Sequence, residues 1–374
     1  MKKSLVALAT LSVVGTAFAD VDVSGGIKLY GVLDQAVTNQ TLTDPSVASR
    51  SSTYTSLFAS SATSRFGFKG NRDLGDGFKG RIQVEIQVEP DNSTQLPAKN
   101  RGAFVGLGKA ETGEILLGTQ ETTAYEIFGM DVNGRVEYKP QVWRTTASSS
   151  TQDRANNAVK YISPDFGGLT AHFMRGFTDK ASTTYSSSFV SYGVKYSQDK
   201  LKAAYVHDKL TNSAASYKFA GLVDAGPSNE GATYSSSALV YGGSATSTSS
   251  NVQRDIGAVT YDFGMLSVNY IYAKSYVKDT NAGSNSTNTV GVKVPYEKFT
   301  FALSYGGGTI DSYSSSATTA ISKDTTFDDT TLGVYYNIDK STSVYFLNSN
   351  SNYLGGVVQD GRNTTYAIGA RYNF

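Results

Sequence analysis

The sequence predicts an all-β fold, a 16-stranded antiparallel transmembrane β-barrel, and three observations lead to this prediction. Apolar residues alternate with polar or small residues along most of the chain, which is typical of strands with one apolar face. Short turns alternate with long loops rich in Ser, Thr, Asn and Gly. The chain is 12% aromatic but only 17% charged, whereas an ordinary soluble domain is roughly 25% charged.

The composition argues against several classes of function. Thirty-three Lys and Arg against 32 Asp and Glu leave a net charge of +1, so no strong field is available to gather nucleic acid. The chain has no Cys and only two His. It can therefore form neither disulfides nor a thiolate metal site, and it has little material for an imidazole site. We expect no cofactor, no metal site and no nucleic-acid partner.

The first nineteen residues have the pattern of a secretory signal peptide. Two lysines follow Met1, an apolar run extends over 5–14, and Ala17-Phe18-Ala19 forms a small-x-small cleavage site. The segment is too short for a membrane-spanning helix, which needs about 20 predominantly apolar residues. We therefore predict a signal peptide at 1–19 and a single exported β-barrel at 20–374, with 31 basic and 32 acidic residues.

The strands follow from the alternation with period two. Over 266–272, for example, Leu, Val and two Tyr take one face while Ser267 and Asn269 take the other. Sixteen such segments fit the even strand number of single-chain bacterial barrels. They begin near Val21, Ser64, Phe78, Arg101, Glu114, Asn157, Leu169, Ser188, Leu201, Arg254, Leu266, Thr289, Phe299, Thr330, Thr342 and Asn363.

The connections between these segments fall into two lengths, which favours an outer-membrane barrel over a soluble sandwich. Such barrels have short periplasmic turns at one rim and longer extracellular loops at the other. We expect short turns at 73–77, 164–168, 198–200, 262–264 and 337–340, and long loops at about 36–63, 121–155, 210–252, 277–287, 306–329 and 350–362.

The end of the chain supports a closed barrel. The apolar alternation continues from Tyr366 to the last residue, Phe374, although chain termini usually fray into water. We expect this last strand to pair with the first, at 21–34, so that no sheet edge stays exposed.

Several segments resemble the general porins of Gram-negative bacteria, particularly the β-proteobacterial branch. The matching segments are Leu29–Asp34, Ser64–Gly70, Asp73–Gly75, Phe104–Leu107, Asn157–Tyr161, Ser163-Pro164 and Arg371–Phe374. The resemblance implies a homotrimeric diffusion pore for small hydrophilic solutes, whose third loop folds inward and narrows the barrel; here that loop is 121–155. The family often has Gly-Arg-Gln before this loop, whereas this chain has Gly118-Thr119-Gln120.

In such a pore, discrimination depends on its width and on the charges that line it. The alternation directs six cations from the wall strands into or beside the lumen, while the loop contributes Tyr125, Glu126 and Asp131. The cations are Lys28, Arg65, Arg81, Arg101, Arg154 and Lys160. We predict that these walls of opposite charge create a transverse field and a weak preference for anions. A lone arginine in a lumen is also commonly a solvated wall residue.

Three other functions are open to test. Catalysis would need a positioned base, and both His172 and His207 are typical of plain wall or loop positions. A sugar-specific channel would use the aromatic residues of the loop, Tyr125, Phe128, Tyr138 and Trp143. An adhesin would depend on the Ser-rich loop at 210–252. We expect the protein to contact copies of itself, outer-membrane lipid, lipopolysaccharide, small hydrophilic solutes and inorganic ions.

Overall fold

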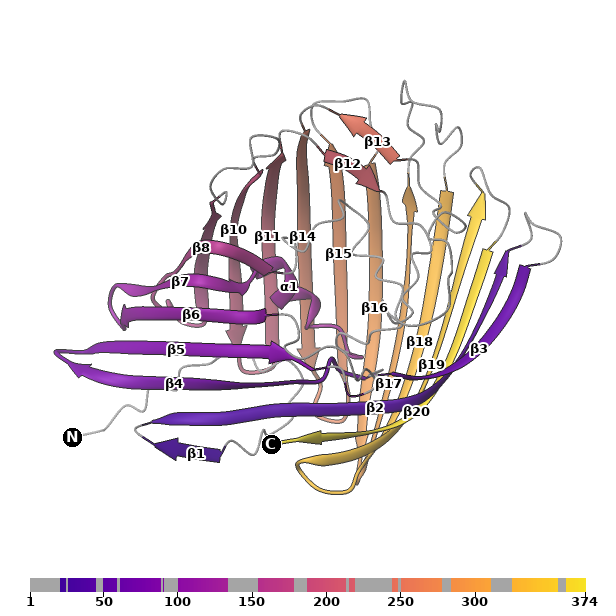
Figure 1. Ribbon diagram of the computed structural model, residues 1–374, viewed down its shortest axis with the longest axis horizontal. Coiled ribbons are helices and arrows are strands. Elements are labelled where there is room, and N and C mark those ends of the chain that lie inside the picture. The colour runs from indigo at the N-terminus through magenta and orange to yellow at the C-terminus, as the bar shows by residue number, and fades with distance from the viewer. Residues whose placement is uncertain are drawn as a thin grey trace.

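The protein forms a curved wall of antiparallel strands that closes on itself (Figure 1). The computed structural model describes residues 21–24, 26–44, 50–58, 61–88, 90, 100–133, 154–177, 187–212, 215–218, 244–247, 250–277, 284–310, 325–355 and 361–374. The predicted signal peptide lies outside these residues. Within them, no helix is both long and apolar enough to cross a membrane.

The strands of the wall follow one another in chain order around the barrel. They are β2 (Ile27–Asp44), β3 (Arg50–Phe58), β4 (Arg65–Gly75), β5 (Phe78–Gln87), β6 (Asn100–Lys109), β7 (Gly113–Glu121), β8 (Arg154–Ile162), β9 (Leu169–Gly176), β10 (Ser187–Gln198), β11 (Leu201–Asn212), β14 (Ser250–Asp262), β15 (Ser267–Val277), β16 (Ser284–Tyr296), β17 (Phe299–Ile310), β18 (Thr325–Asn337), β19 (Thr342–Gly355) and β20 (Gly361–Asn373). Because β3 and β4 together fill one position beside β2, the described strands make a 16-stranded barrel, as predicted.

Three smaller elements lie outside this count. Strand β1 (Val21–Ser24) folds back onto the start of β2, and β12 (Ala215–Lys218) pairs only with β13 (Ser244–Ser247). The short helix α1 (Thr123–Phe128) follows β7 and lies within the curve of the wall (Figure 1).

The first and last barrel strands close the sheet, which confirms the predicted pairing of the two ends. Strands β2 and β20 are in register from the pair Val32 and Asn373 to the pair Thr43 and Arg362. The backbones of Gly31 and Phe374 exchange two hydrogen bonds, of 2.7 and 3.0 Å. The terminal residue is therefore held by the sheet.

The start of the chain differs from the prediction in two ways. The predicted strand at 21–34 is divided, because the chain turns back at Gly26, which has a positive φ of 81°. The predicted loop at 36–63 is wrong, since β2 continues to Asp44 and β3 pairs with it. Thr, Ser and Asn dominate this part of the sequence, so its backbone forms strands without the apolar alternation that reveals them.

The two faces of the wall have opposite character. Outward-facing side chains near the middle of the wall are apolar and exposed, as at Val84, Val105 and Ile368. Inward-facing neighbours are polar or charged, as at Glu85 on β5. An apolar outer band around a polar interior is typical of barrels that span the outer membrane.

Candidate functional site

The loop after β7 enters the barrel through α1. Thr122 caps the helix, because its hydroxyl accepts a hydrogen bond of 3.2 Å from the backbone N–H of Tyr125. The apolar side of this segment packs against inward-facing residues of three strands. This cluster contains Ala124, Ile127, Phe128, Met130, Ala204, Val206, Ile256, Ala258, Ile271 and Ala273. The segment thus lies against the inner face of β11, β14 and β15. Tyr205, which lies between the buried Ala204 and Val206 on β11, is exposed on the outer face.

The described part of the loop ends on the far wall of the barrel. The backbone N–H of Val132 donates to Asn269 Oδ1 on β15 over 3.2 Å. Asn133 Nδ2 donates to Ser304 Oγ on β17 over 2.9 Å and to the carbonyl oxygen of Thr331 on β18 over 3.1 Å. Residues 122–133 therefore contact inward-facing side chains around much of the wall. The rest of the predicted loop, 134–153, lies outside the described residues.

Phe128 anchors this loop, since it is only 2% exposed and lies in the apolar cluster. Replacing a buried Phe with Ala typically costs about 3–5 kcal/mol. We expect Phe128→Ala to release α1 from the wall and to increase the fluctuations of the open-channel current, measured on single channels in planar bilayers. Phe263→Ala is the matched control, because Phe263 is 56% exposed near a short turn. Equal noise in the two variants would contradict this role for Phe128.

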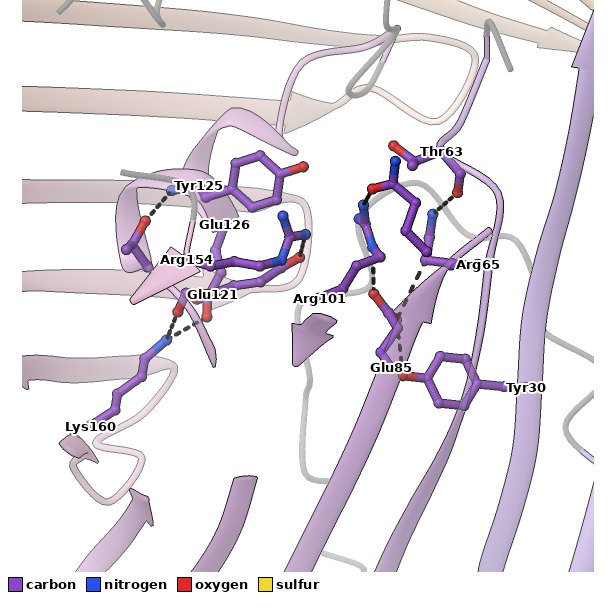
Figure 2. A network of polar contacts seen from close by, with 12 residues as sticks. Tyr30, Thr63, Arg65, Glu85, Arg101, Glu121, Tyr125, Glu126, Arg154 and Lys160 are labelled. Atoms are coloured by element: carbon purple, nitrogen blue, oxygen red, sulfur yellow. Dashed lines mark hydrogen bonds and ion pairs between the residues drawn. The ribbon is translucent and has the colours of Figure 1, made fainter. Parts of the chain in front are cut away.

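One charged cluster lies on β2, β4, β5 and β6 (Figure 2). Glu85 binds Arg101 Nε at 2.8 Å and Arg65 Nε at 3.6 Å, and it accepts a 2.9 Å hydrogen bond from the Tyr30 hydroxyl. One carboxylate thus holds two guanidinium groups, so the cluster keeps an excess positive charge. The side chains of Arg65 and Arg101 are 22% and 7% exposed.

A second cluster joins the loop to the wall. Glu126 on α1 forms ion pairs with Lys160 on β8, at 2.5 Å, and with Lys195 on β10 (Figure 2 shows the first). Burial raises the pKa of the Glu126 carboxyl, but the two ammonium groups outweigh burial and hold this pKa well below its ordinary value. Glu126 therefore stays ionised and fixes α1 to the wall.

The other candidate residues are distributed around these clusters. Arg154 pairs with Glu121 at 2.9 Å, and its guanidinium lies 4.8 Å from the ring centre of Tyr125. Arg81 pairs with Glu114 at 3.1 Å. Two candidates lie apart from both clusters. Lys28 is opposite Lys69 on β4, and Asp131 is buried, where it accepts a hydrogen bond from the backbone N–H of Asn133.

The expected arrangement of charges needs one correction. We expected Glu126 to face the wall cations across the lumen, whereas it is in direct contact with Lys160 and Lys195. The candidate cations predicted from the sequence do not include Lys195, although the alternation along β10 places it on the polar face. What the sequence lacks is the information that β10 lies beside α1.

The residues proposed for other functions are occupied in packing and hydrogen bonding. Phe128 is buried in the apolar cluster, and Tyr125 is 4% exposed beneath Arg154. His172 lies 3.1 Å from the hydroxyl of Thr170, and His207 pairs with Asp255 at 2.8 Å. Tyr138 and Trp143 lie outside the described residues. The described aromatic residues of the loop therefore form no exposed stacking surface.

A cavity of about 960 Å³ occupies the lumen beside these clusters, and we call it the lumen cavity. Its charged lining is strongly biased, with nine cations against five carboxylates among the described residues. The cations are Arg65, Lys69, Arg81, Arg101, Lys160, Lys293, Lys298, Lys340 and Arg371, and the carboxylates are Glu85, Glu121, Glu126, Glu297 and Asp339. Arg154 and Lys28 are outside this lining.

A closed barrel with an apolar outer band and a charged, hollow interior defines a membrane channel protein. The family described as Gram-negative porin matches residues 4–374, and the chain belongs to this family. It is thus a diffusion channel of the outer membrane.

Comparisons with individual proteins agree with this assignment. The chain is 26% identical to outer membrane porin protein 32 of Delftia acidovorans, over the full length of both. It is 28% identical to major outer membrane protein P.IB of Neisseria meningitidis, over 82% of this chain and 93% of that protein. The fold is similar to the anion-selective porin from Comamonas acidovorans, with a TM-score of 0.71 at 20% identity, over 93% of this chain and 99% of that one. It is also similar to OmpT of Vibrio cholerae in its trimer form, with a TM-score of 0.63 at 14% identity, over 94% and 100%.

Proposed function

We propose that this porin conducts small hydrophilic solutes and ions with a weak preference for anions. The observation that carries the proposal is the lining of the lumen cavity, where the described residues include nine cations against five carboxylates. The anion-selective porin from Comamonas acidovorans, which has a similar fold, supports the same sign of selectivity. The proposed selection needs no covalent chemistry, because a pore discriminates by its width and its charges.

The ion pairs explain why the preference is weak. Glu85 and Glu126 each hold two cations, so each group of three charges retains a net positive charge. The pairs also hold the long side chains against the wall, which keeps the path of the solute open. An anion passing the wall meets oriented N–H donors and a modest positive potential.

The assembly we propose is a homotrimer embedded in outer-membrane lipid and lipopolysaccharide. The apolar outer band supports contact with lipid, and the trimer form of the Vibrio cholerae relative supports the stoichiometry.

The proposal is tested by the reversal potential of the purified protein in a planar bilayer under a KCl gradient. We expect ohmic currents and a reversal potential whose sign shows that chloride crosses more readily than potassium. A reversal potential of the opposite sign would refute the anion preference. Small currents that a single sugar blocks would favour a substrate-specific channel instead.

A further inference from the structure

The strand position beside β2 is interrupted where β3 gives way to β4. Strand β3 pairs with β2 up to Phe58, and β4 resumes the pairing at Arg65. Between these two points lie six residues, 59–64, whereas β2 advances by only three, 33–35. Residues in excess of the ladder cannot pair with the neighbouring strand, so they bend the chain and direct its side chains differently.

The described part of this connection, residues 61–64, extends into the lumen, and we call it the inward bend. Its first three residues all line the lumen cavity, although a regular strand directs neighbouring side chains to opposite faces. Figure 2 shows Thr63 beside Arg65, with Tyr125 of α1 facing this group from the other side. Tyr125 lines the same cavity. The inward bend and α1 therefore border one passage.

Asp34 on β2 holds the inward bend through both its side chain and its backbone. Its Oδ1 atom accepts a 3.2 Å hydrogen bond from the backbone N–H of Ser61 and a 2.7 Å hydrogen bond from the Tyr345 hydroxyl. The backbone N–H of Asp34 donates to Ser64 Oγ over 2.9 Å, and this hydroxyl donates to the carbonyl oxygen of Asp34 over 3.0 Å. Asp34 and Ser64 are both fully buried, so these bonds are stronger than they would be in water.

The inward bend also contacts two arginines of the wall. Arg65 Nη1 donates a 2.8 Å hydrogen bond to the carbonyl oxygen of Thr63, and Arg371 Nη1 donates a 3.1 Å hydrogen bond to Ser61 Oγ. At the end of the bend, the backbone N–H of Val88 donates to the carbonyl oxygen of Ser64 over 3.0 Å. The position of the bend therefore affects where these guanidinium groups lie as well as where its own backbone lies.

We propose that the inward bend is the second border of the narrowest passage, opposite α1, and that Asp34 is the residue that positions it. This inference rests on the proposed function, because it concerns how that pore discriminates between ions. The two borders are held differently. Ion pairs of Glu126 hold α1, whereas hydrogen bonds between buried groups hold the bend. A change of charge at Thr63 should therefore alter the selectivity of the pore.

Cysteine substitution tests this border directly, because the native chain has no Cys. Thr63→Cys is treated in a planar bilayer with a methanethiosulfonate that carries a sulfonate, or with one that carries a trimethylammonium group, and mass spectrometry confirms the modification. We expect the sulfonate to lower the chloride-to-potassium permeability ratio about fivefold and the trimethylammonium group to raise it by a similar factor, since a unit charge close to a passing ion has an effect of about this size.

Thr300→Cys is the matched control for this experiment. Thr300 lines the same lumen cavity beside a short turn, and like Thr63 it is half-buried. The same reagents should change the permeability ratio less than about twofold there, because the solution screens a charge that lies away from the narrowest passage. Equal shifts at the two positions, or no shift in modified Thr63→Cys, would overturn the proposal.

Three further substitutions in the Thr63→Cys protein test the role of Asp34. Asp34→Ala removes the acceptor of the Ser61 N–H, and Ser64→Ala removes the hydroxyl that joins the two backbones, so each should reduce the fivefold shift to about twofold. Asp34→Asn removes the charge but keeps an acceptor oxygen, so the shift should stay near its full size. An equal loss in Asp34→Asn and Asp34→Ala would show that Asp34 acts through its charge and not by positioning the bend. Failure of the proposed function is separate, since it would appear in the sign of the reversal potential before any reagent is added.

Discussion

Glu126→Gln should loosen the attachment of α1 to the wall and strengthen the preference for anions. The substitution leaves Lys160 and Lys195 without their shared carboxylate, and these side chains are only 3% and 8% exposed. Breaking a buried ion pair typically costs about 3–5 kcal/mol, because an uncompensated charge remains. We expect a loss near the lower limit in the free energy of unfolding, measured by urea titration in lipid vesicles. The chloride-to-potassium permeability ratio should rise in the same variant.

Glu114→Gln is the matched control for this prediction. Glu114 pairs with a single cation, Arg81, and both side chains are more than 20% exposed, so its loss should cost less than about 1 kcal/mol.

A measurement of the native protein at acidic pH provides a second control. A carboxyl whose pKa is depressed on folding stabilises the fold above its unfolded pKa, and this contribution is lost only as the pH falls through the folded value. The native protein should therefore keep its conductance at pH 5, and a loop that loosens there would contradict our account of Glu126.

The sequence predicts the faces of the strands better than it predicts the partners across the lumen. The alternation with period two places Arg65, Arg81 and Lys160 inward, because neighbouring side chains on a strand take opposite faces. Their environment depends instead on contacts between distant segments. Glu126 meets Lys195 across 69 positions of the chain, and Arg371 meets Ser61 across 310. No local pattern contains such information, since it arises only when the barrel closes.

The strands that the hydropathy pattern does not predict have one physical feature in common. Strand β3 and the extension of β2 to Asp44 consist largely of Thr, Ser, Asn and Gln. Two polar faces give no alternation in hydropathy, so these segments resemble loop in the sequence although their backbones complete the ladder. The sequence also does not predict that β3 and β4 are separate strands that pair with different parts of β2. Ser61, which lies between these two strands, accepts a hydrogen bond from Arg371.

Removing both arginines that share Glu85 should produce the largest change in selectivity. In Arg65→Gln/Arg101→Gln, the described lining of the lumen cavity falls from nine cations to seven, and Glu85 loses both of its ion pairs. A unit charge 4 Å from a passing ion contributes about 1 kcal/mol in water, which corresponds to about fivefold in permeability. We therefore expect the chloride-to-potassium ratio to fall by on the order of tenfold, so that the preference for anions is lost, as measured by the reversal potential.

Two further variants separate the effect of charge from the effect of shape. Adding Glu85→Gln to the double variant removes the isolated carboxylate, so a large part of the lost chloride permeability should return. Arg81→Gln removes one wall cation whose partner is Glu114 and not Glu85, and it should cause about half of the change because only one charge is lost. If the triple variant behaves like the double variant, the arginines act by filling the pore, and the electrostatic basis of the anion preference is wrong. The double and triple variants differ by one charge and by almost no volume. Only an electrostatic mechanism therefore explains a return of chloride permeability in the triple variant.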